Sequence, residues 1–187
     1  MPADTSLPKH WSCCGAPIAG RLHEPDDDVS PHEAYLRNKQ LCVNTLVRHP
    51  VDKDLYCVVS RKDDRTKFCF PGGKVDPGDW PSPTSMAANN AGAESIIMSA
   101  CVAGAVRETR EESGLVVLPK DLVFIMGSCC FLDGQNNNRY AACFLAKTFS
   151  GALGTSEPID VKWGRAKEAI DGPFGDLYGR MFARLKS

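Results

Sequence analysis

The chain has 187 residues, a length that suits one domain and allows a substantial hydrophobic core. A formal net charge of −1 excludes the electrostatic attraction that drives non-specific binding to nucleic acids and membrane surfaces. The apolar fraction of 43% is ordinary for a globular protein, and no apolar stretch is long enough to cross a bilayer. The N-terminal region lacks a basic segment followed by an apolar one, so we expect no secretory signal peptide.

The nine cysteines are an odd number, and most of them lie within apolar runs. This pattern predicts reduced, buried thiols in a reducing compartment, the cytoplasm. A zinc site is the alternative, because Cys13 and Cys14 with His10 and His23 supply suitable ligand types. These residues lack the CxxC pairs and the spacing of structural zinc sites, so we favour buried thiols.

Residues 1–36 are rich in Pro, Asp, Ser and His and show no sustained periodicity, which predicts an irregular N-terminal arm. A short helix near 32–37 is the exception. Apolar runs at 41–47 and 55–60 predict two strands, and the turn-rich HPVDKD between them predicts a hairpin. We expect the globular domain to comprise residues 37–187.

A glycine loop with the sequence FPGGKVDPGD follows at residues 70–79. Residues 80–93 are small, polar and Pro-containing, as in a surface loop. From 94 to 113, apolar residues recur at helical spacing, and Gly114 stands where a helix commonly ends. Gly104 lowers the stability of this helix relative to Ala, which indicates close packing against the sheet.

Strand-like apolar runs follow at 122–132 and 140–147, joined by the turn-rich DGQNNNR. A short strand at 159–163, a short helix at 165–170 and an amphipathic helix at 177–186 complete the chain. The order of strands, helix, strands and final helix predicts an α/β fold in which helices flank a mixed β-sheet.

The predicted central helix ends in RETREESGL, which places three carboxylates on one stripe. Because Glu108, Glu111 and Glu112 follow helical spacing, they project from neighbouring points of one face. Crowded carboxylates repel one another unless a cation lies between them, and hard oxygen ligands favour Mg²⁺ or Mn²⁺. Arg107 lies four residues before Glu111 and can orient it. An ordinary charged helix surface is the alternative, and the glycine loop upstream argues against it.

Together, FPGG and REtrEEsGL resemble the Nudix box, G-x5-E-x7-R-E-U-x-E-E-x-G-U, in which U is a bulky apolar residue. The resemblance covers most of the chain, from about Leu41 to Lys186, and implies an α/β/α sandwich with a mixed sheet. It also implies Mg²⁺- or Mn²⁺-dependent hydrolysis of a pyrophosphate linkage in a nucleoside diphosphate derivative, by attack of water on phosphorus. By position, Glu108, Glu111 and Glu112 match the family's metal-binding glutamates, Arg107 matches the arginine that pairs with one of them, and Gly73 matches the glycine whose carbonyl contacts metal.

The chain departs from the box in two ways. Asp79 stands where the box has its first glutamate, and 27 residues separate Asp79 from Arg107 where the box has far fewer. The excess of about 20 residues places an insertion at about 80–99, near the start of the motif helix. We expect the insertion to displace Asp79, and the loss of Asp79 to matter less than that of Glu112.

The segment SEPIDVKW contains the carboxylate that this family often carries before a late strand, as metal ligand or general base. Glu157 matches its position in some members, and Asp160 is the competing candidate. Basic residues around the glycine loop suit a polyphosphate or a nucleotide, although interleaved aspartates allow ordinary surface charge as the alternative. The candidate substrate-binding residues are Arg61, Lys62, Arg65 and Lys74.

Three alternatives to a hydrolase of nucleoside diphosphate derivatives stay open. The layout around FPGG is similar to that of diphosphoinositol polyphosphate phosphohydrolases, which normally carry a third glycine and no insertion. A catalytically silent Nudix fold that binds a nucleotide or a protein is the second, and the intact glutamate set argues against it. Hydrolysis of mRNA caps is the third, and an enzyme for this reaction would normally have a more basic surface than this chain provides. We expect a small phosphoanhydride substrate as partner, and the oligomeric state is left open, a homodimer included.

Overall fold

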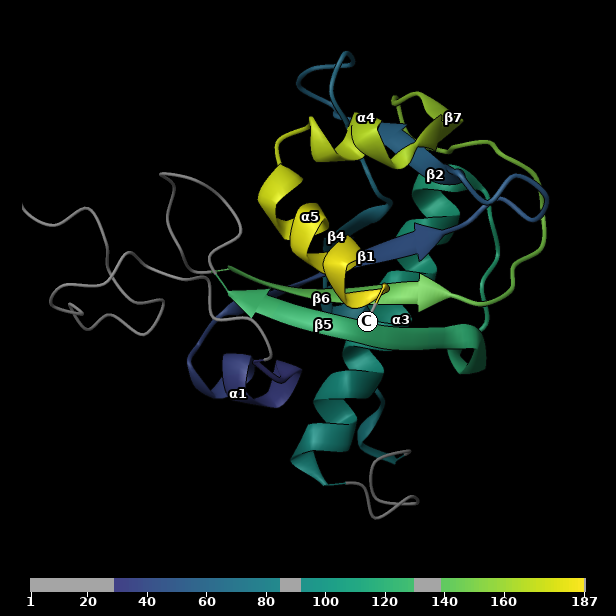
Figure 1. Ribbon diagram of the computed structural model, residues 1–187. Coiled ribbons are helices and arrows are strands. Elements are labelled where there is room, and N and C mark those ends of the chain that lie inside the picture. The colour runs from purple at the N-terminus through teal and green to yellow at the C-terminus, as the bar shows by residue number, and fades with distance from the viewer. Residues whose placement is uncertain (1–28, 85–91, 130–138, 187) are drawn as a thin grey trace, which may run out of the picture.

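The computed structural model describes residues 29–84, 92–129 and 139–186, and the structural statements below refer to these ranges. They form two β-sheets accompanied by helices (Figure 1). The larger sheet has the strand order β4-β1-β6-β5, and the smaller has the order β3-β2-β7. The strands are β1 (Gln40–Val47), β2 (Leu55–Ser60), β3 (Phe68–Cys69), β4 (Gly72–Lys74), β5 (Leu122–Cys129), β6 (Arg139–Ala146) and β7 (Val161–Arg165). The helices are α1 (Pro31–Leu36), α3 (Ala93–Ser113), α4 (Ala166–Ile170) and α5 (Gly175–Arg184), with short 3₁₀ helices η1 (Pro77–Asp79) and η2 (Pro119–Asp121).

The prediction of an α/β fold with a mixed sheet is confirmed by the larger sheet. β1 runs parallel to β6, whereas β4 and β5 pair antiparallel with their neighbours. The two central strands are buried along most of their length, which explains their nearly continuous apolar sequences. β1, β2 and α3 lie within one residue of their predicted ranges, and β7 begins two residues later than predicted. The short strands β3 and β4 lie outside the predicted elements, and β4 contains both Gly72 and Gly73.

The predicted hairpin between β1 and β2 is wrong. The two strands lie in different sheets, and in the described ranges the isolated bridge between Arg48 and Tyr56 is their only ladder pairing. Both edges of β1 are already occupied, by β4 and β6, so β2 pairs instead with β3 and β7. Because β3 belongs to one sheet and β4 to the other, Phe70 and Pro71 between them join the two sheets.

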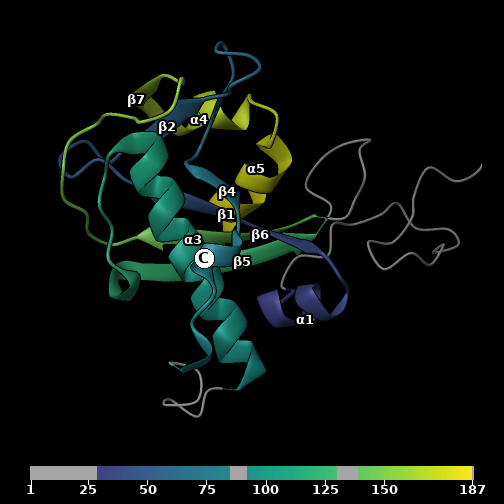
Figure 2. The same cartoon turned by 180° about the vertical axis from the view of Figure 1, so that it is seen from behind.

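The larger sheet lies between α3 on one face and α5 on the other, as the two opposite views show (Figures 1 and 2). Leu41 and Val43 of β1 share a buried cluster with Ile97 of α3. Leu46 of the same strand shares a second cluster with Tyr178 of α5. The two sides follow from the alternation of side chains along a strand. The layers form the α/β/α sandwich that the sequence resemblance implies.

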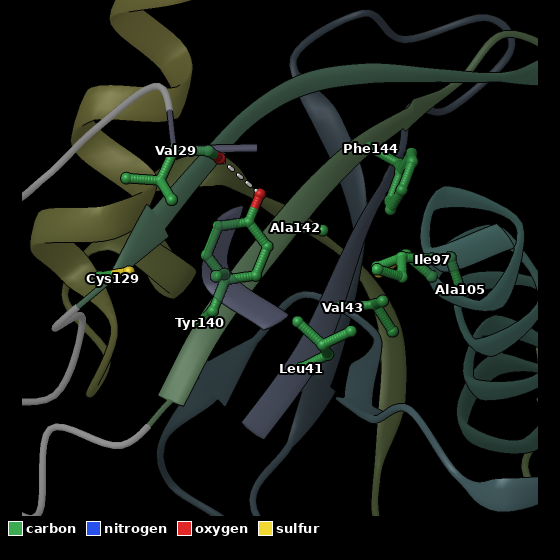
Figure 3. Packing of buried hydrophobic residues seen from close by; sticks show 11 residues of the cluster. Val29, Leu41, Val43, Ile97, Ala105, Cys129, Tyr140, Ala142 and Phe144 are labelled. Carbon is green, nitrogen blue, oxygen red and sulfur yellow. Dashed lines mark hydrogen bonds between the residues drawn. The ribbon is translucent and has the colours of Figure 1, made fainter. Parts of the chain in front are cut away.

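The folded body includes residues that precede the domain boundary predicted at residue 37. Val29 is buried, and its carbonyl accepts a hydrogen bond of 2.7 Å from the hydroxyl of Tyr140 on β6 (Figure 3). Helix α1 packs against α3 and β1, and the Ser30 hydroxyl caps it by accepting from the N–H of Glu33 at 3.1 Å. The insertion predicted at 80–99 contributes the first turns of α3, against which α1 lies. Residues 1–28 of the predicted arm lie outside the described ranges.

Five of the six described cysteines are buried, as the sequence predicts. The residues of the alternative zinc site, His10, Cys13, Cys14 and His23, lie outside the described ranges. The same holds for the turn-rich residues 133–138 and for the end of the strand predicted at 122–132. Among the described helices, none combines the length and apolarity that crossing a membrane requires.

Candidate metal and phosphate site

The motif glutamates lie in the last two turns of α3. Ile97, Cys101 and Ala105 bury one stripe of this helix, at a spacing of four residues. The helix ends at Gly114, whose positive φ of 70° lets its N–H donate to the carbonyl of Arg110 at 2.9 Å. Helix α3 also contacts β4 directly. A long, well-anchored helix therefore delivers the motif residues to the glycine loop.

The guanidinium group of Arg107 joins the glycine loop to the motif helix. It donates to both carboxylate oxygens of Asp79, at 3.0 and 2.9 Å. It also donates to Glu108 at 2.9 Å, to Glu111 at 3.0 Å and to the carbonyl of Lys74 at 2.9 Å. The bonds to Asp79, above all, raise the pKa of Arg107 beyond its already high ordinary value. The insertion therefore does not separate Asp79 from the motif helix, and the expected displacement of Asp79 is wrong in this respect.

Asp79 is a buried carboxylate held by several donors. Besides the bonds from Arg107, it accepts from the backbone N–H of Asp76 at 2.8 Å. Burial alone would raise the pKa of Asp79, but the hydrogen bonds outweigh burial and lower it. A Cβ atom on Gly104 would lie 3.1 Å from the Asp79 carboxylate, so this glycine admits the loop to the helix surface. The close packing predicted for Gly104 is therefore against this loop and Val75 rather than against the sheet.

Two glycines bring the loop backbone close to the glutamates. The N–H of Gly72 donates to a carboxylate oxygen of Glu112 at 2.8 Å. A Cβ atom on Gly73 would overlap the carboxylate of Glu108, and one on Gly72 would overlap the carbonyl of Val43. The loop can approach β1 and α3 this closely because both positions lack a side chain.

Burial and mutual repulsion disfavour the charged forms of two motif glutamates. Burial raises the pKa of Glu112 to about 8, and the carboxylates of Glu108 and Glu157 add to this effect. Burial likewise raises the pKa of Glu108 despite its bond to Arg107, and Glu111 and Glu157 contribute to the rise. Glu108, Glu112 and Glu157 therefore lie near enough to one another for their negative charges to oppose.

Glu157 lies in the loop before β7, and this loop is tied to the motif helix. The hydroxyl of Thr155 donates to the backbone carbonyl of Glu111 at 3.1 Å. The ammonium group of Lys62 contacts the two carboxylate oxygens of Glu157 at 3.0 and 2.9 Å. Asp160, the competing candidate, is an exposed residue that pairs with a surface arginine at 3.6 Å. The structure thus brings Glu157, rather than Asp160, to the motif glutamates.

A cleft of about 490 Å³ opens beside the glycine loop. Arg65, one of the predicted substrate-binding residues, does not line it, because its guanidinium group donates to the carbonyl of Pro158 at 3.1 Å and pairs with Asp160. The other three predicted residues do line the cleft, together with the glycines and one motif glutamate: Arg61, Lys62, Lys74, Gly72, Gly73 and Glu112.

Several further residues line the cleft without having been predicted from the sequence, among them Asn44, Arg139 and Phe174. The guanidinium carbon of Arg61 lies 5.6 Å from the centre of the Phe174 ring, so the two form a stacked pair at the cleft wall. Arg139 and Phe174 come from segments far from the motif, and no local sequence signal distinguishes them. Asn44 carried a signal, because it is a polar residue inside the apolar strand LCVNTLV.

The carboxylates of the site are suitable ligands for a divalent cation, although they do not converge on a single metal position. Across residues 29–84, 92–129 and 139–186, no group of three His, Cys, Asp or Glu side chains is arranged to hold a metal ion. The carboxylates accept from Arg107, Lys62 and Gly72 instead. Burial, together with neighbouring carboxylates, raises the pKa values of Glu108 and Glu112, and a cation beside these hard oxygen donors, such as Mg²⁺ or Mn²⁺, would oppose that effect. The candidates to hold the ion are therefore Glu108, Glu111 and Glu112, with the carbonyl of Gly73.

No family model and no curated protein sequence matches this chain. Its fold does resemble solved structures. The ORF135 protein of E. coli is 18% identical, with a TM-score of 0.54 over 80% of this chain and 92% of that one. The NUDIX domain of Shewanella oneidensis NrtR, solved in complex with ADP ribose, is 15% identical, with a TM-score of 0.53 over 79% of this chain and 88% of that one. The chain therefore has the Nudix fold, as its motif predicts.

Proposed function

We propose that this protein is a metal-dependent hydrolase that cleaves a pyrophosphate linkage in a nucleoside diphosphate derivative. The observation that supports this best is that Glu112 lines a cleft bordered by glycine backbone and basic side chains, with its pKa raised by burial and by the nearby carboxylates of Glu108 and Glu157. Clefts that hold carboxylates with raised pKa values are typical of catalytic sites. A cleft that only bound an anion would gain nothing from acidic side chains, which disfavours a catalytically silent fold.

The acidic side of the cleft would hold the cation. Mg²⁺ or Mn²⁺ held by Glu108, Glu111 and Glu112 would neutralise phosphate charge and activate the attacking water. Arg107 orients Glu108 and Glu111 through its fixed guanidinium geometry. Glu157 is our candidate for the group that accepts a proton, because it lies beside the motif glutamates and is held by a flexible lysine.

The basic side of the cleft would bind the phosphates. Arg61, Lys62 and Lys74 line it, and their charges suit phosphoryl oxygens. Arg65 is dropped from this role because it does not line the cleft. Gly72 and Gly73 also line the cleft, so backbone as well as basic side chains borders the space that a phosphate would occupy.

The bound molecule in the similar NUDIX domain of NrtR, ADP ribose, is a nucleoside diphosphate derivative. That likeness, together with the moderate number of basic residues in the cleft, supports this substrate class over diphosphoinositol polyphosphates, whose dense phosphates favour a more basic site. The buried thiols support a reducing, cytoplasmic location, which we also propose.

A substrate panel with Mg²⁺ and with Mn²⁺ tests the proposal. The panel contains ADP ribose, other nucleoside diphosphate sugars, dinucleoside polyphosphates, nucleoside triphosphates and a diphosphoinositol polyphosphate, and the readout is release of phosphate or nucleoside monophosphate. Glu112→Gln should lower turnover at least about a hundredfold through loss of an essential metal-binding or proton-accepting group. Glu94→Gln, the same change on the exposed first turn of α3, is the control and should match wild type. Failure of every substrate with both metals would contradict the proposal.

A further inference from the structure

A buried chain of hydrogen bonds fixes the side-chain amide of Asn44 at the cleft. Asn44 lies on β1 and is only 8% exposed. The hydroxyl of Tyr178, on α5, donates to the Oδ1 atom of Asn44 at 3.0 Å. The same hydroxyl accepts from the backbone N–H of Phe70 at 3.3 Å. The chain thus links the sheet, the C-terminal helix and the residue that opens the glycine loop.

This chain determines which way the amide points. The N–H of Phe70 can only donate, so the oxygen of Tyr178 is its acceptor and the hydroxyl hydrogen must find another partner. Tyr178 is fully buried, and an unpaired hydroxyl hydrogen there would be costly. The partner of that hydrogen must therefore be the amide oxygen of Asn44, and the NH₂ group points away from Tyr178.

The NH₂ group is then left on the cleft side. Asn44 lines the cleft and is paired with Gly72 in the register of β1 and β4. A Cβ atom on Gly72 would lie 3.1 Å from Oδ1 of Asn44 and would overlap the carbonyl of Val43, so the missing side chain lets β4 lie close against β1 beside Asn44. Within the described part of the chain, the bond from Tyr178 is the only hydrogen bond of the Asn44 side chain. If Asn44 served only to accept the hydrogen bond from Tyr178, any acceptor would be enough at this position, and the NH₂ group would have no role.

We propose that Asn44 is a substrate-binding residue whose NH₂ group donates to a phosphoryl oxygen, and that Tyr178 is the positioning residue that keeps the amide turned to the cleft. The inference rests on the proposed function, because it takes the cleft to receive a pyrophosphate group. Gly72, opposite Asn44, donates to Glu112, so the amide lies beside the metal-binding end of the cleft. A neutral NH₂ donor binds a phosphoryl oxygen without competing with the cation for the carboxylates.

Binding of imidodiphosphate, a non-hydrolysable pyrophosphate analogue, measured by calorimetry with Mg²⁺, tests the inference. Asn44→Ala should weaken binding about tenfold or more, as for loss of a hydrogen bond to a charged group. Asn44→Asp keeps an acceptor for Tyr178 but replaces the donor with a negative charge, so it should weaken binding further. Tyr178→Phe should cause a smaller loss, of about threefold, because Asn44 can then turn; Tyr35→Phe, at an exposed tyrosine, is its control.

A purely structural role would not change the same quantities. The affinity for Mn²⁺ alone should stay within about twofold of wild type in Asn44→Ala, and KM for a cleaved panel substrate should rise more than kcat falls. A second measurement uses the wild-type protein and does not depend on whether a variant folds. The side-chain NH₂ resonances of Asn44 in an NMR spectrum should shift when imidodiphosphate binds.

Two results would overturn the inference: unchanged NH₂ resonances at saturation, or binding by folded Asn44→Ala within about twofold of wild type. If the wild-type protein cleaves panel substrates while these results are negative, the role of Asn44 fails and the proposed function stands. If the wild-type protein neither cleaves the panel nor binds imidodiphosphate with Mg²⁺, the proposed function fails, and the role of Asn44 fails with it.

Discussion

The charged residues of the site are held in pairs that join distant parts of the chain. Arg107 binds Asp79 across 28 positions, and Lys62 binds Glu157 across 95. The sequence identifies most of these residues singly, because residue type and place in a motif are local properties. It does not pair them, because pairing depends on how loops and sheets pack. Asp79 is an example: the sequence predicts that the insertion displaces it, but an insertion can lengthen a loop without moving the loop's ends.

Asp79→Ala is predicted to destabilise the protein more than it impairs catalysis. The change removes two hydrogen bonds from the partly buried guanidinium group of Arg107, along with the buried carboxylate that accepts them, which should lower Tm by roughly 5–10 °C in thermal unfolding. Turnover should fall by less than in Glu112→Gln, because Asp79 orients Arg107 and does not itself line the cleft.

Two companion variants make the Asp79 measurement specific. Asp171→Ala removes an exposed pair with Lys167 and should change Tm little. Asp79→Glu keeps the charge and should recover part of the stability, limited by the close contact with Gly104. An unchanged Tm in Asp79→Ala would show that the contacts with Arg107 contribute nothing to the fold.

At the scale of elements, α3 was predictable and the sheet pairing was not. Its apolar residues repeat at helical spacing over many turns, and Gly114 supplies the left-handed end that such a helix requires. Strand pairing is decided by competition between strands for the same edge. β1 and β2 are therefore correct as strands and wrong as a hairpin, because β4 and β6 occupy both edges of β1. The close approach of the glycine loop to the glutamates of α3 is likewise a property of the packed structure, and the loop sequence alone does not predict it.

Three glycine-to-alanine variants separate the roles of the loop positions. Gly73→Ala should leave the fold intact but displace the Glu108 carboxylate, a flexible group, and so lower turnover about tenfold or more. Gly72→Ala would meet the backbone carbonyl of Val43, which cannot yield as easily, and should also lower Tm. Gly78→Ala is the control, because a Cβ atom there meets nothing within 4 Å. Equal activity in Gly73→Ala and Gly78→Ala would contradict the assigned position of Glu108.

For the whole molecule, the crowded carboxylates of the site lower the stability of the folded protein when no cation is bound. Glu108 and Glu112 are partly buried, and burial together with neighbouring carboxylates, including that of Glu157, raises the pKa of each. In the unfolded chain these carboxylates ionise at their ordinary pKa values. When the protein folds without a cation, these carboxylates must therefore either take up protons or remain charged close to one another. The same arrangement would favour a divalent cation strongly, so stability and metal binding are linked through the carboxylates.

The metal-free protein is therefore predicted to lose stability as pH rises from about 4.5 to about 8. Over this range Glu112 is protonated in the folded state, with its pKa raised to about 8, and ionised in the unfolded state. The unfolded state then binds fewer protons, and the free energy of unfolding falls with pH. Asp79 acts oppositely and in a lower range, because its lowered pKa adds stability that is lost only as pH falls below its ordinary value.

Thermal unfolding in EDTA across this pH range measures the effect. Tm should fall by roughly 5 °C or more between pH 5 and pH 8, and Glu112→Gln should flatten the decline and be more stable than wild type at pH 8. Glu94→Gln, on the exposed end of α3, should keep the wild-type slope. Mg²⁺ or Mn²⁺ should raise the wild-type Tm most at pH 8, where the carboxylates must otherwise ionise unpaired, and should affect Glu112→Gln less. A wild-type Tm that rises steadily with pH in EDTA would contradict the burial of Glu112 beside the other carboxylates.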